Sequence, residues 1–264
     1  MSIVLSGRKV ETPGLETVSW LDDPKVPRTT DTNPRTKWVR AIVMHTVSGK
    51  EGHVRPGNSP PSTRAETYAK YQANTTRDVS WDYTIDTDGT IIVSNDPLVW
   101  YTWQATAVNS WTIGIEMVQE SNGDVWEGQI ATAVKFLDFI TRELADRGHP
   151  IQRQVPMGPL GKPVRGVIPR IEDAEKAKSV VGVYGHRNQT HNRGPGDPGD
   201  AIFEALLKAG YKGMNLDAQD DITFWKSVQH RLGLTEDGVP GPGTATALKA
   251  AGYPHGLWVT RPGD

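Results

Sequence analysis

The sequence has no cysteine among its 264 residues. Disulfide bonds are therefore excluded, and so are a thiolate nucleophile and thiolate metal ligands. Any bound metal ion must be held by His, Asp or Glu side chains. The chain also lacks an excess of charge of one sign, because its formal net charge is −2 at pH 7. Without a broad basic field, a nucleic acid partner is not expected.

Long apolar runs are absent too. No segment approaches the roughly 18 consecutive apolar residues of a membrane-spanning helix, so insertion into a membrane is not expected. The N-terminal segment MSIVLSGRKVETPGLE has only a short apolar stretch before polar residues follow, which is unlike a secretory signal peptide. We therefore expect a protein that is cytoplasmic at synthesis and needs outside help for any export.

The segments that are present predict an α/β fold. Strands are predicted where β-branched and apolar residues gather, at residues 38–44, 112–118 and 180–184, and as a hairpin at residues 81–93 around an Asp-Gly turn. Helices are predicted at residues 64–73, 129–147 and 200–209, the first with Thr63 as its N-cap. Strands that alternate with helices indicate a mixed central β-sheet flanked by helices.

The remaining segments divide the chain into domains. Residues 1–36 are polar and interrupted by prolines, which predicts an irregular arm, and residues 149–170 predict a long Pro/Gly-rich loop. Residues 211–220 predict a polar linker, and residues 221–264 predict a separate small helical module. We therefore expect a main domain over residues 1–210 that includes the arm, then the linker and the module.

Three residues could hold a metal ion. His45 and His186 each lie at the end of a predicted strand, and Asp197 lies in a glycine- and proline-rich turn. Taken singly, each has an ordinary structural interpretation, as a hydrogen-bonded histidine or as an acid that caps a helix. Taken together, they are the ligand set of a catalytic zinc site with an open fourth position. Because the three are far apart in the sequence, spacing alone does not decide between these interpretations.

Glu116 is a candidate general base. It lies inside the apolar strand at residues 112–118, where an acid without a partner is costly to bury. Zinc lowers the pKa of bound water towards ~7, and a carboxylate could take the proton of that water and pass it to a leaving amine. Since the side chains of a strand alternate between faces, the residue could also point to solvent.

Four motifs occur in a defined order along the chain. They are AIVMHT (41–46), SWDYTIDTDGTI (80–91), NSWTIGIEM (109–117) and GHRNQTHNRGPGDPGDAIF (185–203). Together they resemble the type-2 N-acetylmuramoyl-L-alanine amidases, a family that includes phage endolysins, bacterial amidases and peptidoglycan recognition proteins. The resemblance covers roughly residues 38–210. It implies the amidase-2 fold and zinc-dependent cleavage of the amide bond between N-acetylmuramic acid and L-alanine in peptidoglycan.

The resemblance also assigns roles to single residues. His45, His186 and Asp197 match the family's zinc ligands, so Zn2+ is the expected cofactor, and Glu116 matches the acid thought to act as general base. Peptidoglycan, both its glycan strand and its stem peptide, is the implied substrate.

Other positions depart from the family's pattern. The family commonly has a cation two residues before the third ligand, where this chain has Pro195. Arg193 or His191 could replace that cation, and we take Arg193 as the residue that stabilises the oxyanion. Trp81-Asp82 and Trp103-Gln104-Ala105 stand where the family often has Tyr-His and aromatic-His-Ala. We expect these changes to affect the substrate groove more than the reaction.

The C-terminal module has a resemblance of its own. Residues 224–252 are similar to the small three-helix peptidoglycan-binding domain, whose Leu-Gly-Leu-x-x-Asp-Gly pattern begins here at Leu232. Such a domain raises the effective concentration of an enzyme on a polymeric wall. The alternative is a helical tail that only packs on the main domain.

These observations favour a phage or prophage endolysin that acts on the cell wall after holin-assisted release. Two alternatives remain at this point. A non-catalytic peptidoglycan-binding or recognition protein could have the same fold, because fold does not determine function. A different metal hydrolase, such as a peptidase that cuts within the stem peptide, would need a similar site.

Overall fold

A six-stranded mixed β-sheet forms the centre of the computed structural model, which describes all residues except 22–32, 159–160, 215–225, 227, 239–241 and 252–264. In sheet order its strands are β13 (Gly182–Gly185), β5 (Ala41–Thr46), β10 (Thr112–Met117), β7 (Tyr83–Ile85), β8 (Ile91–Val93) and β3 (Thr17–Ser19). The first four run parallel, β8 is antiparallel to β7, and β3 is parallel to β8. The predicted mixed sheet flanked by helices is confirmed.

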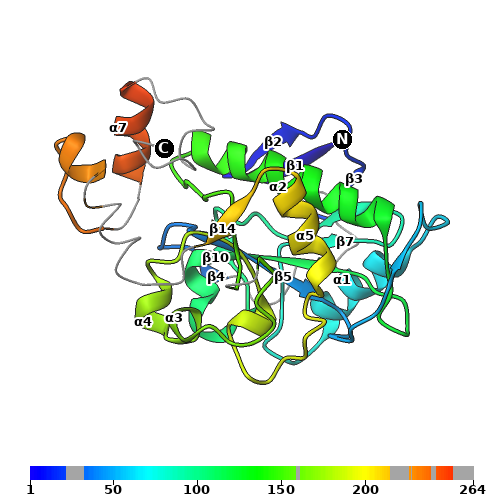
Figure 1. Ribbon diagram of the computed structural model, residues 1–264. Helices are drawn as coiled ribbons and strands as arrows, with labels where there is room; N and C mark the ends of the chain where they lie inside the picture. The colour runs from blue at the N-terminus through cyan, green and yellow to red at the C-terminus, as the bar shows by residue number, and fades with distance from the viewer. Residues whose placement is uncertain (22–32, 159–160, 215–225, 227, 239–241, 252–264) are drawn as a thin grey trace.

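One face of the sheet packs against two long helices. Helices α2 (Glu127–Asp146) and α5 (Asp200–Lys208) lie side by side over it (Figure 1). The apolar stripe of α2, which includes Phe136 and Ile140, packs into one core with alternate strand residues such as Ile42 and Met44. That alternation assigns the odd-numbered residues of β5, including His45, to the opposite face.

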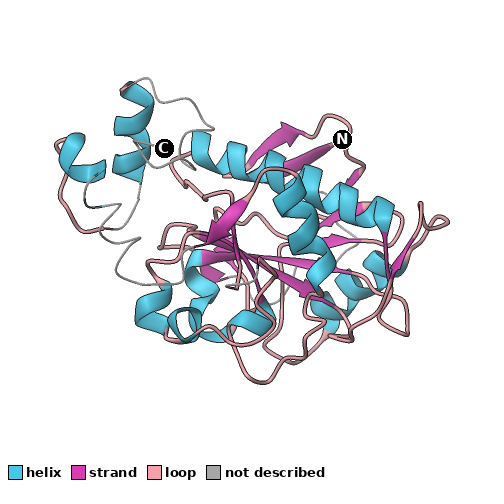
Figure 2. Cartoon of the chain, viewed as in Figure 1, coloured by secondary structure: helices cyan, strands magenta, loops and turns pink. Residues whose placement is uncertain are grey.

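The opposite face is covered by shorter elements, so that helices flank the sheet on both sides (Figure 2). They are α1 (Arg64–Asn74), the 3-10 segments η1 (Thr106–Trp111) and η2 (His186–Asn188), α3 (Pro169–Glu172) and α4 (Ala174–Ala177). Helix α1 packs on β7 and β8 through Ala65, Ala69 and Ile92. Because these elements are short and joined by loops, this face has room for a site.

Among the residues that the structure describes, four two-stranded ribbons lie around the sheet. They pair β1 (Ser2–Leu5) with β2 (Arg8–Glu11), β4 (Asn33–Pro34) with β9 (Trp100–Tyr101), β6 (Val54–Arg55) with β11 (Val125–Trp126), and β12 (Gln154–Pro156) with β14 (Lys212–Met214). The β12–β14 pair joins the predicted loop 149–170 to the predicted linker, so part of residues 211–220 is a strand of the main domain.

The prediction of an irregular arm over residues 1–36 was wrong for residues 1–21, which form three strands, whereas residues 22–32 lie outside the described part of the chain. Ile3 and Leu5 are fully buried in the main core, and β3 forms an edge of the central sheet. Ser6 and Gly7 have φ angles of 54° and 73° and make the tight turn between β1 and β2. Asp96 fixes that turn by accepting hydrogen bonds from both backbone amides, at 3.0 and 2.6 Å.

Helix α1 is capped differently from the prediction. Thr63 makes no side-chain capping bond. The backbone amide of Ala65 donates instead to Asp86 Oδ2 at 2.8 Å, and Asp86 comes from the end of the β7–β8 hairpin. A carboxylate at a helix N-terminus is favourable for the same reasons as an N-cap, but here it is supplied from a distant element.

The C-terminal module is helical where it is described. Residues 228–231 and α7 (Pro242–Ala250) form helices, whereas residues 221–225, 227, 239–241 and 252–264 of the predicted module lie outside the described residues. That this module binds peptidoglycan stays a prediction. Among the described helices, none is both long and apolar enough to cross a membrane.

Candidate functional site

The parallel register of the central strands brings two predicted site residues together. In the β5–β10 pair, His45 lies directly opposite Glu116. Both side chains therefore leave the sheet on the face opposite α2 and α5. On the other side of β5, strand β13 ends at Gly185 beside Met44, and His186 is the next residue. Neighbouring strands thus deliver both histidines and the acid to the same end of the sheet.

Asp197 joins the two histidines from the following loop. Its Oδ1 lies 3.9 Å from His45 Nδ1, and its Oδ2 lies 3.6 Å from His186 Nδ1. The two imidazole rings are 4.6 Å apart and inclined by 72°. All three residues are buried, and their ligand atoms lie within 4.8 Å of one another. In the described part of the chain this is the one such group of three.

Backbone contacts with strand β5 fix the position of Asp197. The amide of Thr46 donates to Asp197 Oδ1 at 3.0 Å, and the Thr46 hydroxyl donates to the carbonyl of Gly196 at 2.5 Å. The side chain does not cap a helix, since α5 begins at Asp200 with Gly199 as its cap residue. The helix-cap interpretation of Asp197 is therefore wrong.

A buried arginine shapes the loop that carries Asp197. Arg187 is 1% exposed, and its guanidinium donates to the Pro195 carbonyl at 2.6 Å and to Asp200 Oδ1 at 2.8 Å. It lies over the ring of Phe203, 5.2 Å from the centroid, and its backbone amide donates to the Asp197 carbonyl at 2.9 Å. These contacts hold both ends of the turn before α5.

The histidine and carboxylate groups fit a metal ion. His186 Nδ1 is buried and has no hydrogen-bond partner, which is unusual for a buried polar atom. Burial lowers the pKa of His186 to about 2 and also lowers the pKa of His45. Both rings are thus neutral at pH 7, and a lone pair is available. Two imidazole nitrogens and one carboxylate oxygen match a zinc site with an open fourth position.

Glu116 lies beside this group in a nearly enclosed position. Its side chain is 8% exposed. Burial raises the pKa of Glu116 well above its ordinary value, Asp197 raises it further, and Arg193 opposes the shift. The solvent-facing alternative for this residue is wrong. A carboxyl group held beside the reacting atoms can accept a proton and pass it on.

A cleft of about 720 Å³ opens over these residues. One wall is helix α1, which contributes Tyr68 and Tyr71, and Trp81 and Arg77 lie farther along. The lining also includes His45, Thr46, Val47, Arg64, Thr67, Val79, Gln104, Glu116, Gln119, Ser121, Arg193 and Asp197. The mixture of aromatic and polar side chains suits a ligand with both apolar and hydrogen-bonding parts.

The two cations considered for oxyanion stabilisation are placed differently. Arg193 lines the cleft, and its Nε lies 3.6 Å from Asp197 Oδ2. Its side chain is 51% exposed, which leaves part of the guanidinium free for a ligand. His191 is 78% exposed and pairs with Glu172 at 3.4 Å, and it does not line the cleft. The geometry thus favours Arg193.

Sequence reasoning missed the roles of two polar residues. Gln104 Oε1 lies 2.6 Å from His45 Nε2, so it contacts the candidate metal centre directly. Asp82 is fully buried and accepts hydrogen bonds from Asn95, Thr102 and the Gly114 amide. Its expected place in the groove was therefore wrong. Both positions depart from the family pattern in the sequence, but only the fold shows which atoms they contact.

The sequence and the fold were compared with those of known proteins. A family model described as N-acetylmuramoyl-L-alanine amidase matches residues 34–200. No curated protein sequence gives a significant match.

Several solved structures are similar at low identity. The N-acetylmuramoyl-L-alanine amidase LysC from Clostridium intestinale URNW is 14% identical, covers 76% of this chain and 100% of its own, and gives a TM-score of 0.40. The Staphylococcus aureus hydrolase AmiA is 17% identical, with 77% and 88% coverage and a TM-score of 0.37. The ectodomain complex of peptidoglycan recognition proteins LCa and LCx is 11% identical, with 75% and 98% coverage and a TM-score of 0.44.

Proposed function

This chain belongs to the N-acetylmuramoyl-L-alanine amidase family, whose model matches most of its length, and on that premise we propose that its reaction depends on zinc held by His45, His186 and Asp197. As a member of the family it is an amidase that acts on peptidoglycan. The bond it cleaves joins N-acetylmuramic acid to L-alanine. The observation that supports the metal centre is the convergence of three buried ligand groups with an unpartnered His186 Nδ1.

The residues around the centre divide the work of the reaction. When bound, zinc supplies a Lewis acid that makes a water nucleophilic at neutral pH and polarises the scissile carbonyl. Glu116, directly opposite His45, accepts the proton of the attacking water and transfers it to the leaving amine. Arg193, on the cleft side of Asp197, stabilises the negative charge that develops on the carbonyl oxygen. The cleft along α1 holds the stem peptide so that the bond is positioned for attack.

Digestion of purified sacculi tests this proposal. The protein is incubated with isolated peptidoglycan, with and without a chelator, and the products are identified by mass. Release of intact stem peptides from muramic acid, lost with the chelator and restored by added zinc, is the expected result. Cuts within the stem peptide would identify a peptidase, and sacculus binding without any release would identify a non-catalytic recognition protein.

We also propose that the protein is an endolysin of a phage or prophage. It would remain in the cytoplasm until a holin opens the membrane and would then act on the wall. The C-terminal module, with its described helices, is the proposed wall anchor. Expression in a bacterial host with and without a pore-forming partner tests this role. Lysis that requires the partner supports it, and lysis by the enzyme alone contradicts it.

A further inference from the structure

A chain of buried hydrogen bonds leads from the backbone to His45. The Thr112 hydroxyl donates to the carbonyl of Val108 at 2.9 Å. Gln104 Nε2 donates to the Thr112 hydroxyl oxygen at 2.6 Å. At the other end of the same amide, Gln104 Oε1 lies 2.6 Å from His45 Nε2. Thr112 is fully buried and Gln104 is 7% exposed, so these hydrogen bonds are shielded from water.

The donors and acceptors of each group determine the direction of every hydrogen bond in this series. A hydroxyl has one proton, and here Thr112 uses it on the Val108 carbonyl, so its oxygen can only accept from Gln104. The amide nitrogen of Gln104 must then face Thr112, and its oxygen must face His45. An amide oxygen only accepts, so His45 Nε2 must carry a proton. A flipped amide would take the Thr112 proton for its own oxygen, so the hydrogen bond from Thr112 to the Val108 carbonyl would be lost.

The surroundings leave Gln104 little freedom to choose another orientation. Its backbone amide and that of Ala105 both donate to Asn109 Oδ1, at 3.0 and 2.6 Å. Across the sheet face lies Gly114, where a Cβ atom would come 2.8 Å from Gln104 Cγ. Glycine at that position makes room for the glutamine side chain against the strand.

We propose that Gln104 is a positioning residue that holds His45 in the tautomer protonated at Nε2. The lone pair is thereby placed on Nδ1, the nitrogen that lies 3.9 Å from Asp197 Oδ1. The reason that His45 would need this tautomer rests on the proposed zinc-dependent function. The tautomer itself is a property of the metal-free protein and is tested there. A hydrogen bond to the second nitrogen of a metal-ligating histidine commonly changes metal affinity about 10- to 100-fold on removal.

The tautomer is measured by NMR on metal-free protein with 15N-labelled histidine. Long-range correlations between ring nitrogens and ring protons distinguish Nε2–H from Nδ1–H. The expected wild-type result for His45 is Nε2–H. His149 is the internal reference, because its Nδ1 accepts from the Val39 amide at 3.1 Å independently of Gln104. Unchanged His149 signals in each variant show that the fold is retained.

Four variants separate the links of the chain. Gln104→Met and Thr112→Val remove the amide and the hydroxyl at similar volume, and we expect a mixture of His45 tautomers in both. Gln104→Glu keeps an acceptor for Nε2–H, and Thr112→Ser keeps the hydroxyl, so both should retain the wild-type tautomer. Zinc affinity, measured by competition with a chelating dye, should fall about 10- to 100-fold in Gln104→Met and remain within a few-fold of wild type in Thr112→Ser.

The outcomes distinguish this inference from the proposed function. A wild-type His45 protonated at Nδ1, or a Gln104→Met variant with unchanged tautomer and zinc affinity, overturns the role of Gln104 even if the enzyme is a zinc amidase. The converse outcome is also possible. If the wild-type protein binds no zinc, but its His45 has the Nε2–H tautomer and Gln104→Met loses it, then Gln104 does position His45. In that case zinc binding is not the purpose of this positioning.

Discussion

Glu116 is buried and lies next to the candidate metal centre, directly opposite His45 in the sheet. Every residue of its strand β10 is buried, and burial is the main cause of its raised pKa. A buried acid lowers the stability of the fold unless it is paired or hydrogen-bonded, so its presence calls for a functional reason. The proposed role as proton carrier supplies that reason.

Replacing the carboxyl group should separate catalysis from metal binding. In Glu116→Gln we expect amide hydrolysis to fall at least about 100-fold, because the general base is lost, while zinc stoichiometry stays at the wild-type value. Metal analysis and product release from sacculi measure the two quantities. His45→Ala, which removes a ligand, should lose both. Substantial hydrolysis by Glu116→Gln would show that another group accepts the proton.

The role of Arg193 can be tested against the nearby His191, the other residue considered for it. We expect Arg193→Ala to reduce hydrolysis about 100-fold, the usual effect of removing one donor to a developing oxyanion. His191→Ala is the matched control and should be unaffected, since His191 pairs with Glu172 away from the cleft. Rates on the same sacculi decide the assignment. A normal rate for Arg193→Ala would remove the proposed role.

At the residue scale, residues that lie in a sequence motif could be predicted, whereas residues that act through a contact in the folded protein could not. His45, His186, Asp197 and Glu116 were found because each lies in a motif that resembles a known family. The positioning role of Gln104 could not be found in that way, because it depends on which side-chain atom faces a histidine 59 positions away. The same holds for Arg187, a surface-type residue in sequence that is almost completely buried.

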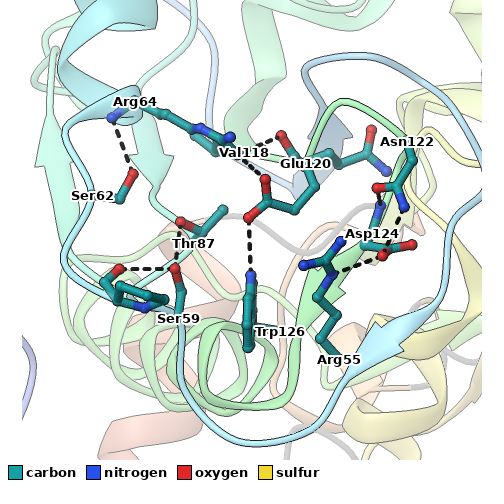
Figure 3. A network of polar contacts seen from close by, with 12 residues as sticks. Arg55, Ser59, Ser62, Arg64, Thr87, Val118, Glu120, Asn122, Asp124 and Trp126 are labelled. Atoms are coloured by element: carbon teal, nitrogen blue, oxygen red, sulfur yellow. Dashed lines mark hydrogen bonds and ion pairs between the residues drawn. The ribbon is translucent and has the colours of Figure 1, made fainter.

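Among the elements, the loop between β5 and α1 is tied closely to the turn after β10. Asp124 accepts hydrogen bonds from the His53 amide at 2.8 Å, Arg55 Nε at 2.8 Å and Asn122 Nδ2 at 2.9 Å. Figure 3 shows this carboxylate beside a second one, Glu120, which binds Arg64 and Trp126. Of these partners Arg64 lines the cleft, so Glu120 ties the turn after β10 to a residue of the cleft wall.

The pH dependence of this loop follows from Asp124. The hydrogen bond from the His53 amide, together with those from Arg55 and Asn122, lowers its pKa to about 2. A depressed pKa means that its stabilising contribution is complete above the ordinary value of 3.8 and is lost as the pH falls through about 2. Titration of the carboxyl 13C signal should give a midpoint near 2. In Arg55→Met the midpoint should move upward, and a wild-type midpoint at or above 3.8 would contradict the geometry.

The loop also packs against the turn that carries Asp197. A Cβ atom on Gly196 would lie 2.1 Å from the Lys50 carbonyl oxygen, so any larger residue must push the two loops apart. We expect Gly196→Ala to destabilise the protein by about 1–3 kcal/mol and to weaken zinc binding, because Asp197 is displaced. Thermal unfolding and metal analysis measure these effects.

A glycine three positions farther on provides the control. A Cβ atom added to Gly199 would meet no other atom within 4 Å, and the residue has an ordinary negative φ of −68°. Gly199→Ala should therefore bind zinc like the wild type. Equal zinc binding by the two alanine variants would show that the contact with Lys50 does not control the position of Asp197.

At the element scale, strong periodicity was a good guide and short strands were not. The stripe of α2 and the Asp-Gly hairpin were confirmed because each contains several apolar residues at regular spacing. Strands β1 and β3 were missed because three or four residues do not establish a pattern, although Ser6-Gly7 is a turn signal. Strand β1 packs on the main core through Ile3 and Leu5, and β3 is held by its pairing with β8 at the edge of the sheet.

For the molecule as a whole, the fold class could be predicted and the strand order could not. Apolar strands that alternate with helices indicate an α/β sheet. The local spacing of residues does not predict that β5 lies between β13 and β10, or that β3 lies at an edge of the sheet. That order decides which residues meet. It places His45 between Glu116 on one neighbouring strand and His186 after the other.

The predicted wall anchor is tested by shortening the chain. Without residues 221–264, we expect weaker retention on sacculi and slower release from them, because the effective concentration on the wall falls. Hydrolysis of a small soluble muramoyl peptide should be unchanged, since the cleft is lined by residues of the main domain. Equal retention of both forms on sacculi would favour the alternative of a tail that only packs.

The order of the site residues along the chain has a consequence for protein synthesis. A ribosome completes His45 and Glu116 long before His186 and Asp197, and β13 can add to β5 only after the intervening segments have emerged. A nascent chain that stops before His186 therefore carries one of the three proposed metal ligands and lacks the turn that holds Asp197. If zinc is held as proposed, fragments that end before His186 cannot assemble the metal centre and should be inactive on peptidoglycan.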